Sequence, residues 1–159
     1  MKMYKQLFFI GLITFFSFNN SKTTYAHCEI PCGIYEDTLR IELIKEHIVT
    51  IEKSMNIIFE LTQEVNPNYN QIVRWVNNKE DHANKLQEIV SQYFLHQRIK
   101  PIDPDNTELY EEYIERLTLL HEILVYSMKA KQTTDLSYIE KLNKAVLAFE
   151  EVYFHSHDH

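Results

Sequence analysis

The chain has 159 residues but only two glycines, Gly11 and Gly33. β-Sandwiches, β-barrels and Rossmann-type sheets depend on turns with positive φ angles, which glycine adopts most easily. The scarcity of glycine therefore argues against these folds and favours helices. The only two cysteines, Cys28 and Cys32, lie beside Gly33. We expect the function to reside in this cluster of rare residues.

The first 26 residues have the pattern of a secretory signal peptide. Lys2 and Lys5 precede an apolar run at residues 7–18, which is too short to span a bilayer comfortably because a spanning helix needs about 20 residues. Small and polar residues follow and end at Ala26. We expect cleavage between Ala26 and His27, export to the periplasm or the extracellular space, and no membrane association after processing. An uncleaved anchor is the alternative.

Apolar residues recur at steps of three and four in four segments, as in amphipathic helices. The segments run from Asp37 to Glu64, from about Asn70 to Arg98, from about Thr107 to Lys131, and onward from a cap at Asp135 or Ser137. Turn residues separate them, and short connections favour antiparallel neighbours. We therefore expect an all-α, antiparallel four-helix bundle over residues 27–159. The faces expected to point inward include Leu39, Val73, Val76, Leu109, Met128, Ile139, Leu142, Val146, Phe149 and Tyr153.

The net charge of −7 argues against a nucleic acid as partner, because binding to phosphates requires clustered cations. The histidines of the helical segments are spaced widely, and we expect no joint site among His47, His82, His96 and His121. The end of the chain carries His155, His157 and His159. We expect a frayed polar tail there, with metal binding as the alternative.

Cleavage after Ala26 leaves residues 27–35, His-Cys-Glu-Ile-Pro-Cys-Gly-Ile-Tyr, at a free N-terminus, and we call this segment the hook. The α-amine of His27 can chelate a metal together with the backbone nitrogen and the thiolate of Cys28. Cys32 can add a second thiolate if Pro31 and Gly33 turn the chain tightly. A planar site of two nitrogens and two sulfurs, with the His27 imidazole as an axial ligand, suits Ni(II) or Cu(II). An ordinary disulfide between the two cysteines is the alternative.

The motif His-Cys-x-x-Pro-Cys-Gly-x-Tyr of the hook resembles that of nickel-containing superoxide dismutases. Residues 39–42, 73–83 and 88–94 are also similar to the family. The resemblance implies a four-helix bundle that assembles as a homohexamer, with hooks between subunits and one nickel ion per subunit. It implies that two superoxide ions and two protons become dioxygen and hydrogen peroxide while nickel cycles between Ni(II) and Ni(III).

The resemblance also assigns the metal ligands. Nickel is bound by the amine and imidazole of His27, by the backbone nitrogen and thiolate of Cys28, and by the thiolate of Cys32. Tyr35 is expected to guard access to the open face of the metal. A nickel or copper carrier without turnover is the second candidate function, and a cytoplasmic location, usual in the family, is the alternative to export.

Three further residues are expected around these ligands. Pro31 shapes the hook, and Glu42 matches the family carboxylate that orients the imidazole of the first ligand. Some members hold that carboxylate with an arginine on the second helix, where this chain has Asn78. Lys79 is the nearest cation to that place, and we expect it to attract superoxide locally. Glu29 replaces the family aspartate in the hook.

Overall fold

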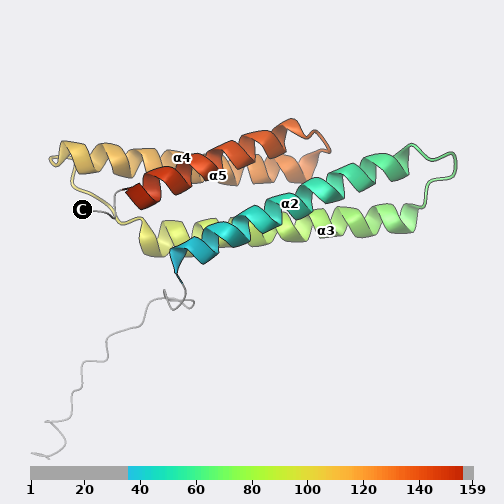
Figure 1. Cartoon of the computed structure of the whole chain (residues 1–159), viewed down its shortest axis with the longest axis horizontal. Helices are drawn as coiled ribbons and strands as arrows, with labels where there is room; N and C mark the ends of the chain where they lie inside the picture. The colour runs from blue at the N-terminus through green and yellow to red at the C-terminus, as the bar shows by residue number, and fades with distance from the viewer. Residues whose placement is uncertain (1–35, 156–159) are drawn as a thin grey trace, which may run out of the picture.

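The computed structural model describes residues 36–155 of the chain. Its helices are α2 (Asp37–Thr62), α3 (Tyr69–Glu88), η1 (Ile89–Arg98), α4 (Thr107–Gln132) and α5 (Ser137–His155), and no strand occurs within the described range. Figure 1 shows two long antiparallel hairpins, α2–α3 and α4–α5, packed against each other. The predicted four-helix bundle is thus confirmed. None of the described helices is both long and apolar enough to span a bilayer.

Turn chemistry places the helix ends close to where the sequence predicts them. The side chain of Asn68 accepts a hydrogen bond from the backbone N–H of Gln71 at 3.2 Å and so caps the start of α3. At the start of α5, the carboxylate of Asp135 accepts one from the backbone N–H of Ser137 at 2.9 Å. Both caps fall next to the predicted breaks, so the lengths of the two hairpins follow from local sequence.

The second helix differs from the prediction of one α-helix ending at Arg98. Its last ten residues, η1, form a π-helix, and the backbone N–H of Ile99 still donates to the carbonyl of Phe94 at 2.9 Å. A π-helical stretch of this length is unusual. Within it, the neighbours Tyr93 and Phe94 are both buried. The wider helix therefore directs two adjacent aromatic rings toward the bundle interior.

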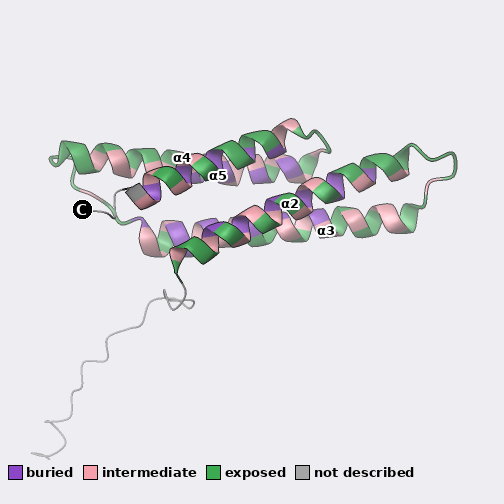
Figure 2. Ribbon diagram, in the orientation of Figure 1, coloured by how far each residue is buried: buried purple, intermediate pink, exposed green. Residues whose placement is uncertain are grey.

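The core lies between the facing surfaces of the four helices, which Figure 2 shows as buried on the inside and exposed on the outside. The rings of Phe94 and Phe149 meet edge to face with centroids 5.0 Å apart, and Tyr153 contacts both. These contacts join η1 to α5. All the predicted inward residues of α5 are buried: Ile139, Leu142, Val146, Phe149 and Tyr153.

Five other residues predicted to face inward are instead exposed: Leu39, Val73, Val76, Leu109 and Met128. For α3 the reason is visible in Figure 1, where the α2–α3 hairpin extends beyond the end of the α4–α5 hairpin. Val73 and Val76 lie in the first two turns of α3, close to the loop that joins α2 to α3. Periodicity shows which side of a helix is apolar, but it does not show whether another helix of the same chain covers that side.

Lys79 is the one buried charged residue among those described, with 4% of its surface exposed. Its ammonium donates to the carbonyls of Ala130, Lys131 and Thr133 at 3.0, 2.6 and 3.0 Å. These carbonyls belong to the C-terminal end of α4, where helix geometry leaves them without partners and the helix dipole favours a cation. Lys79 therefore ties α3 to the end of α4.

We predict that Lys79→Met lowers the free energy of unfolding by about 1–3 kcal/mol, because methionine fills the space of the stem but leaves buried carbonyls unpaired. Lys144→Met, on the exposed face of α5, is the matched control and should change stability little. Urea unfolding followed by circular dichroism measures both. Equal stability of the two variants would contradict the capping role.

Candidate metal centre

Most of the predicted metal centre precedes the described part of the chain. His27, Cys28, Pro31, Cys32 and Tyr35 all lie outside the described residues. The chain nevertheless limits how far Cys32 can be from the bundle, because only four residues, 33–36, separate it from the start of α2 at Asp37, which makes five Cα–Cα steps. A fully extended chain of that length spans roughly 18 Å. The Cα atom of Cys32 is therefore at most roughly 18 Å from that of Asp37.

Asp37 anchors the start of α2 to two other helices. One carboxylate oxygen accepts a hydrogen bond from the hydroxyl of Tyr93 and another from Nε of Arg98 at 3.0 Å. The second oxygen accepts from the hydroxyl of Tyr153 at 2.6 Å. Arg98 also donates to the Tyr93 oxygen at 2.7 Å. One carboxylate thus fixes the point where the hook joins the bundle.

The electrostatics of this anchor favour an ionised carboxylate. Burial by itself would raise the pKa of Asp37, but the hydrogen bonds from Tyr153 and Tyr93 and the charge of Arg98 outweigh burial and lower it. Burial and the neighbouring carboxylate raise the pKa of both tyrosines. Both hydroxyls therefore stay protonated and donate hydrogen bonds to the Asp37 carboxylate. The first turn of a helix also favours a negative charge.

Two guanidinium groups lie against one aromatic ring beside the anchor. The guanidinium carbons of Arg40 and Arg98 are 5.0 and 4.8 Å from the centroid of the Tyr93 ring. The Nε of Arg40 is buried and has no hydrogen-bond partner within the described part of the chain. Because Arg98 is paired with Asp37 at 3.0 Å, Arg40 adds one positive charge beside this ion pair.

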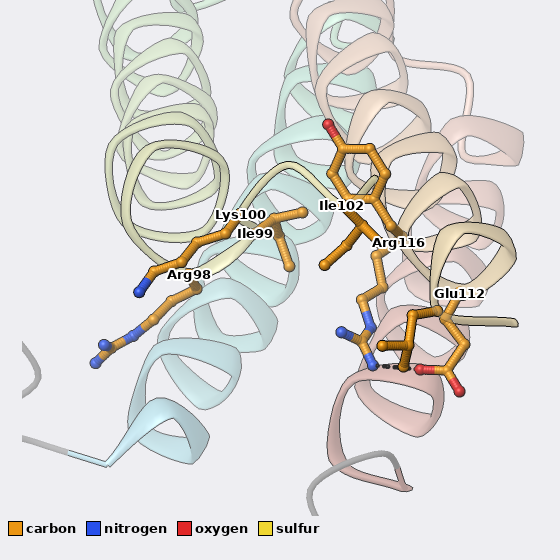
Figure 3. Close-up of a pocket in the computed structure, with 8 residues that line it drawn as sticks. Arg98, Ile99, Lys100, Ile102, Glu112 and Arg116 are labelled. Atoms are coloured by element: carbon orange, nitrogen blue, oxygen red, sulfur yellow. Dashed lines mark hydrogen bonds and ion pairs between the residues drawn. The ribbon is translucent and has the colours of Figure 1, made fainter. Parts of the chain in front are cut away.

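A pocket of about 150 Å³ opens at the same end, between the segment that follows η1 and helix α4. Figure 3 shows Arg98 and Lys100 reaching out on one side of this segment, while Arg116 pairs with Glu112 at 3.1 Å on α4. Ile99 and Ile102 supply apolar walls. The pocket is small and mixed in character, with two ion-paired arginines and Lys100 among its lining residues.

Glu42 lies on α2 a little beyond its first turn. It is five residues after Asp37, so it is displaced by roughly 7.5 Å along α2. Its side chain is 58% exposed, and one carboxylate oxygen lies 2.9 Å from the ammonium of Lys45, which also contacts Glu150 at 2.9 Å. An exposed carboxylate at this position is available to a group from the hook, and its predicted role stays a prediction.

Lys79 lies farther from the start of α2. Its neighbour Asn78 donates to the hydroxyl of Ser54 at 3.0 Å, which places this part of α3 roughly 26 Å along α2 from Asp37. The thiolate of Cys32 in the same chain cannot extend that far. Because the ammonium is also buried and bonded to three carbonyls, the geometry supports a structural role. The predicted role in attracting superoxide finds no support in this placement.

The structure corrects one expectation about the histidines. His47 on α2 and His82 on α3 are neighbours, with their Nδ1 atoms 3.0 Å apart. Burial is the main cause that lowers the pKa of both rings, the Lys85 ammonium lowers it further, and the Glu46 carboxylate acts in the opposite direction. The register of the hairpin could have revealed this pair, because both histidines are similarly distant from the turn. His96 and His121 are exposed.

The described residues contain no group of three or more histidine, cysteine, aspartate or glutamate side chains arranged to hold a metal. The hook, in contrast, would offer an amine after cleavage at Ala26, together with a backbone nitrogen, two thiolates and an imidazole within six residues, 27–32. These strong nitrogen and sulfur donors fit nickel, which favours planar or tetragonal geometry. The chemistry of the donor set is therefore consistent with a nickel centre in the hook.

Comparison with known proteins agrees with this assignment. The family model of nickel-containing superoxide dismutase matches residues 22–157, a range that includes the hook and all the described helices. No curated protein and no solved structure matches the chain.

We predict that Asp37→Asn lowers the free energy of unfolding by about 1–3 kcal/mol at pH 7, because hydrogen bonds to a charged group are lost. The pKa of Asp37 is lower in the folded chain than in the unfolded chain. Its contribution is therefore complete above the ordinary carboxyl pKa of about 3.9 and is lost as the pH falls from there through the folded pKa.

The matched control for this prediction is Glu36→Gln, which neutralises the adjacent exposed carboxylate. Chemical unfolding of both variants and the parent protein between pH 7 and pH 3 measures the effect. A stability difference for Asp37→Asn that persists unchanged at pH 3, or equal effects of the two substitutions, would contradict the anchor.

Proposed function

The chain belongs to the nickel-containing superoxide dismutase family, and we propose that it is an exported superoxide dismutase whose metal is held by its processed N-terminus. The observation that carries this proposal is the family match, which extends through residues 27–35, where the sequence supplies the complete donor set. The four-helix bundle and the anchored start of α2 are consistent with it.

In this proposal the hook holds one nickel ion per subunit. His27 contributes its amine and imidazole, Cys28 its backbone nitrogen and thiolate, and Cys32 its thiolate. Bound nickel supplies the one-electron cycle between Ni(II) and Ni(III) by which two superoxide ions and two protons become dioxygen and hydrogen peroxide. Pro31 shapes the turn between the two thiolates, and Tyr35 controls access to the open face.

The bundle positions the hook and surrounds it with charge. Asp37 fixes the chain two residues after Tyr35, and Glu42 on the next turns of α2 orients the imidazole of the first ligand. Arg40, beside the ion pair of Asp37 and Arg98, provides the local positive charge that an anionic substrate encounters on its approach. This assignment gives Arg40 the part that the sequence suggested for Lys79.

We further propose that the chain assembles as a homo-oligomer, a homohexamer by its family resemblance, in which hooks lie between subunits. Apolar side chains that are exposed on the described helices, such as Leu39, Val73 and Val76, support association, because burial of such surface is favourable. Cleavage of the signal peptide between Ala26 and His27 would create the free amine and deliver the protein to the periplasm or the extracellular space.

The test of this function is a protein with one extra residue before His27. The extension converts the amine into a backbone amide, so the first chelate ring is lost. We predict that nickel content and superoxide turnover both fall by about 100-fold or more, beyond the usual effect of losing an outer-shell partner. The matched control carries the extra residue after His159. Helix content by circular dichroism should be unchanged in both.

Each result of this experiment has a definite meaning. Full turnover by the N-terminally extended protein would contradict the proposal. Nickel binding by the native protein without turnover would identify a carrier. A native mass two units below that of the dithiol, insensitive to nickel, would identify a disulfide between Cys28 and Cys32.

A further inference from the structure

His47 on α2 and His82 on α3 meet across the α2–α3 hairpin. Their Nδ1 atoms are 3.0 Å apart, and their rings cross at 75° with centroids 5.0 Å apart. Each ring projects from the middle of a long helix, so its backbone position is fixed. Two imidazole nitrogens are therefore held together by rigid elements and not by a loop.

A short approach between two ring nitrogens has a limited set of chemical explanations. One neutral ring can donate its N–H to the other, or both nitrogens can face a shared cation. A metal at the usual distance of 2.0–2.1 Å from each nitrogen would subtend an N–metal–N angle of roughly 95° at this spacing. That angle is close to the angle between adjacent ligands in square-planar and octahedral sites. The pair thus has the spacing of two neighbouring metal ligands.

The surroundings of the pair admit a cation. Both rings are half-buried, so an ion can reach them from solvent and keep water as its remaining ligands. Burial and the Lys85 ammonium lower the pKa of His82, which keeps its ring neutral and able to ligate, while the carboxylates of Asp81 and Glu46 favour positive charge nearby. Because the described residues hold no third histidine, cysteine or carboxylate ligand here, the site would be weaker than the hook.

We propose that His47 and His82 form a second metal site, separate from the hook, which takes a divalent transition metal ion through two imidazoles and water. Zn(II), Cu(II) and Ni(II) are the ions that imidazole ligands suit. The bound ion cross-links α2 to α3. Since the unfolded chain does not hold the two rings together, binding stabilises the folded protein.

The test uses the full mature chain with Cys28→Ser and Cys32→Ser, so that the hook thiolates do not compete, and it uses Zn(II) alone as the probe. Thermal unfolding is measured with and without Zn(II) in this parent and in His47→Asn and His82→Asn. Asparagine places an amide where Nδ1 was, so it keeps hydrogen-bonding capacity but removes the imidazole ligand. His121→Asn, on the exposed face of α4, is the matched control.

Zn(II) should raise the Tm of the parent and of the control by about 4 °C when its free concentration is ten times the Kd. The increase should be absent in His47→Asn and in His82→Asn. An equal increase in all four proteins, or none in the parent at millimolar Zn(II), would overturn the proposal. Zinc bound at the hook or at the C-terminal histidines would raise the Tm of all four proteins equally. It would not make the increase depend on His47 and His82.

A second measurement does not depend on the variants folding. Nitrogen NMR of the histidine rings in the parent should show the Nδ1 resonances of His47 and His82 shifting together as Zn(II) is added. Shifts confined to His27 or to the histidines at 155–159, with this pair unchanged, would also overturn the proposal.

Discussion

The carboxylate of Asp37 anchors the start of α2, the helix that follows the proposed metal-binding hook. It accepts hydrogen bonds from Tyr93, Arg98 and Tyr153, so one residue joins the start of α2 to η1 and α5. The hook precedes it by only a few residues and cannot lie far from it. In the proposed enzyme the bundle would act on the metal mainly by fixing this attachment point and by placing Arg40 near it.

The helices could be predicted from the sequence because their causes are local. Apolar periodicity and the caps at Asn68 and Asp135 locate the helices within a few residues. The exposure of Val73 and the buried cap made by Lys79 could not be predicted. Both depend on where the α4–α5 hairpin ends relative to α2–α3, and that offset arises from packing between distant segments.

The donors of the hook could be read from the sequence because they are contiguous, with both cysteines and Gly33 within six residues. The scarcity of glycine argues against sheet-rich folds. It also draws attention to this segment, because the helices need neither glycine nor cysteine and the hook contains both. Groups that meet across helices escaped prediction. The Asp37 cluster and the pair of His47 and His82 each unite residues at least 35 positions apart. Only the hairpin register could have indicated the histidine pair.

In the proposed enzyme a free amine at His27 completes the metal site, so the decisive observation is the identity of the mature N-terminal residue. Mass spectrometry of the protein isolated from its native compartment gives that residue. We predict a chain that begins at His27, with the preceding 26 residues removed. A mature chain that begins at any other residue, or one that retains the leader, would contradict the proposed metal site because the free amine would not be on His27.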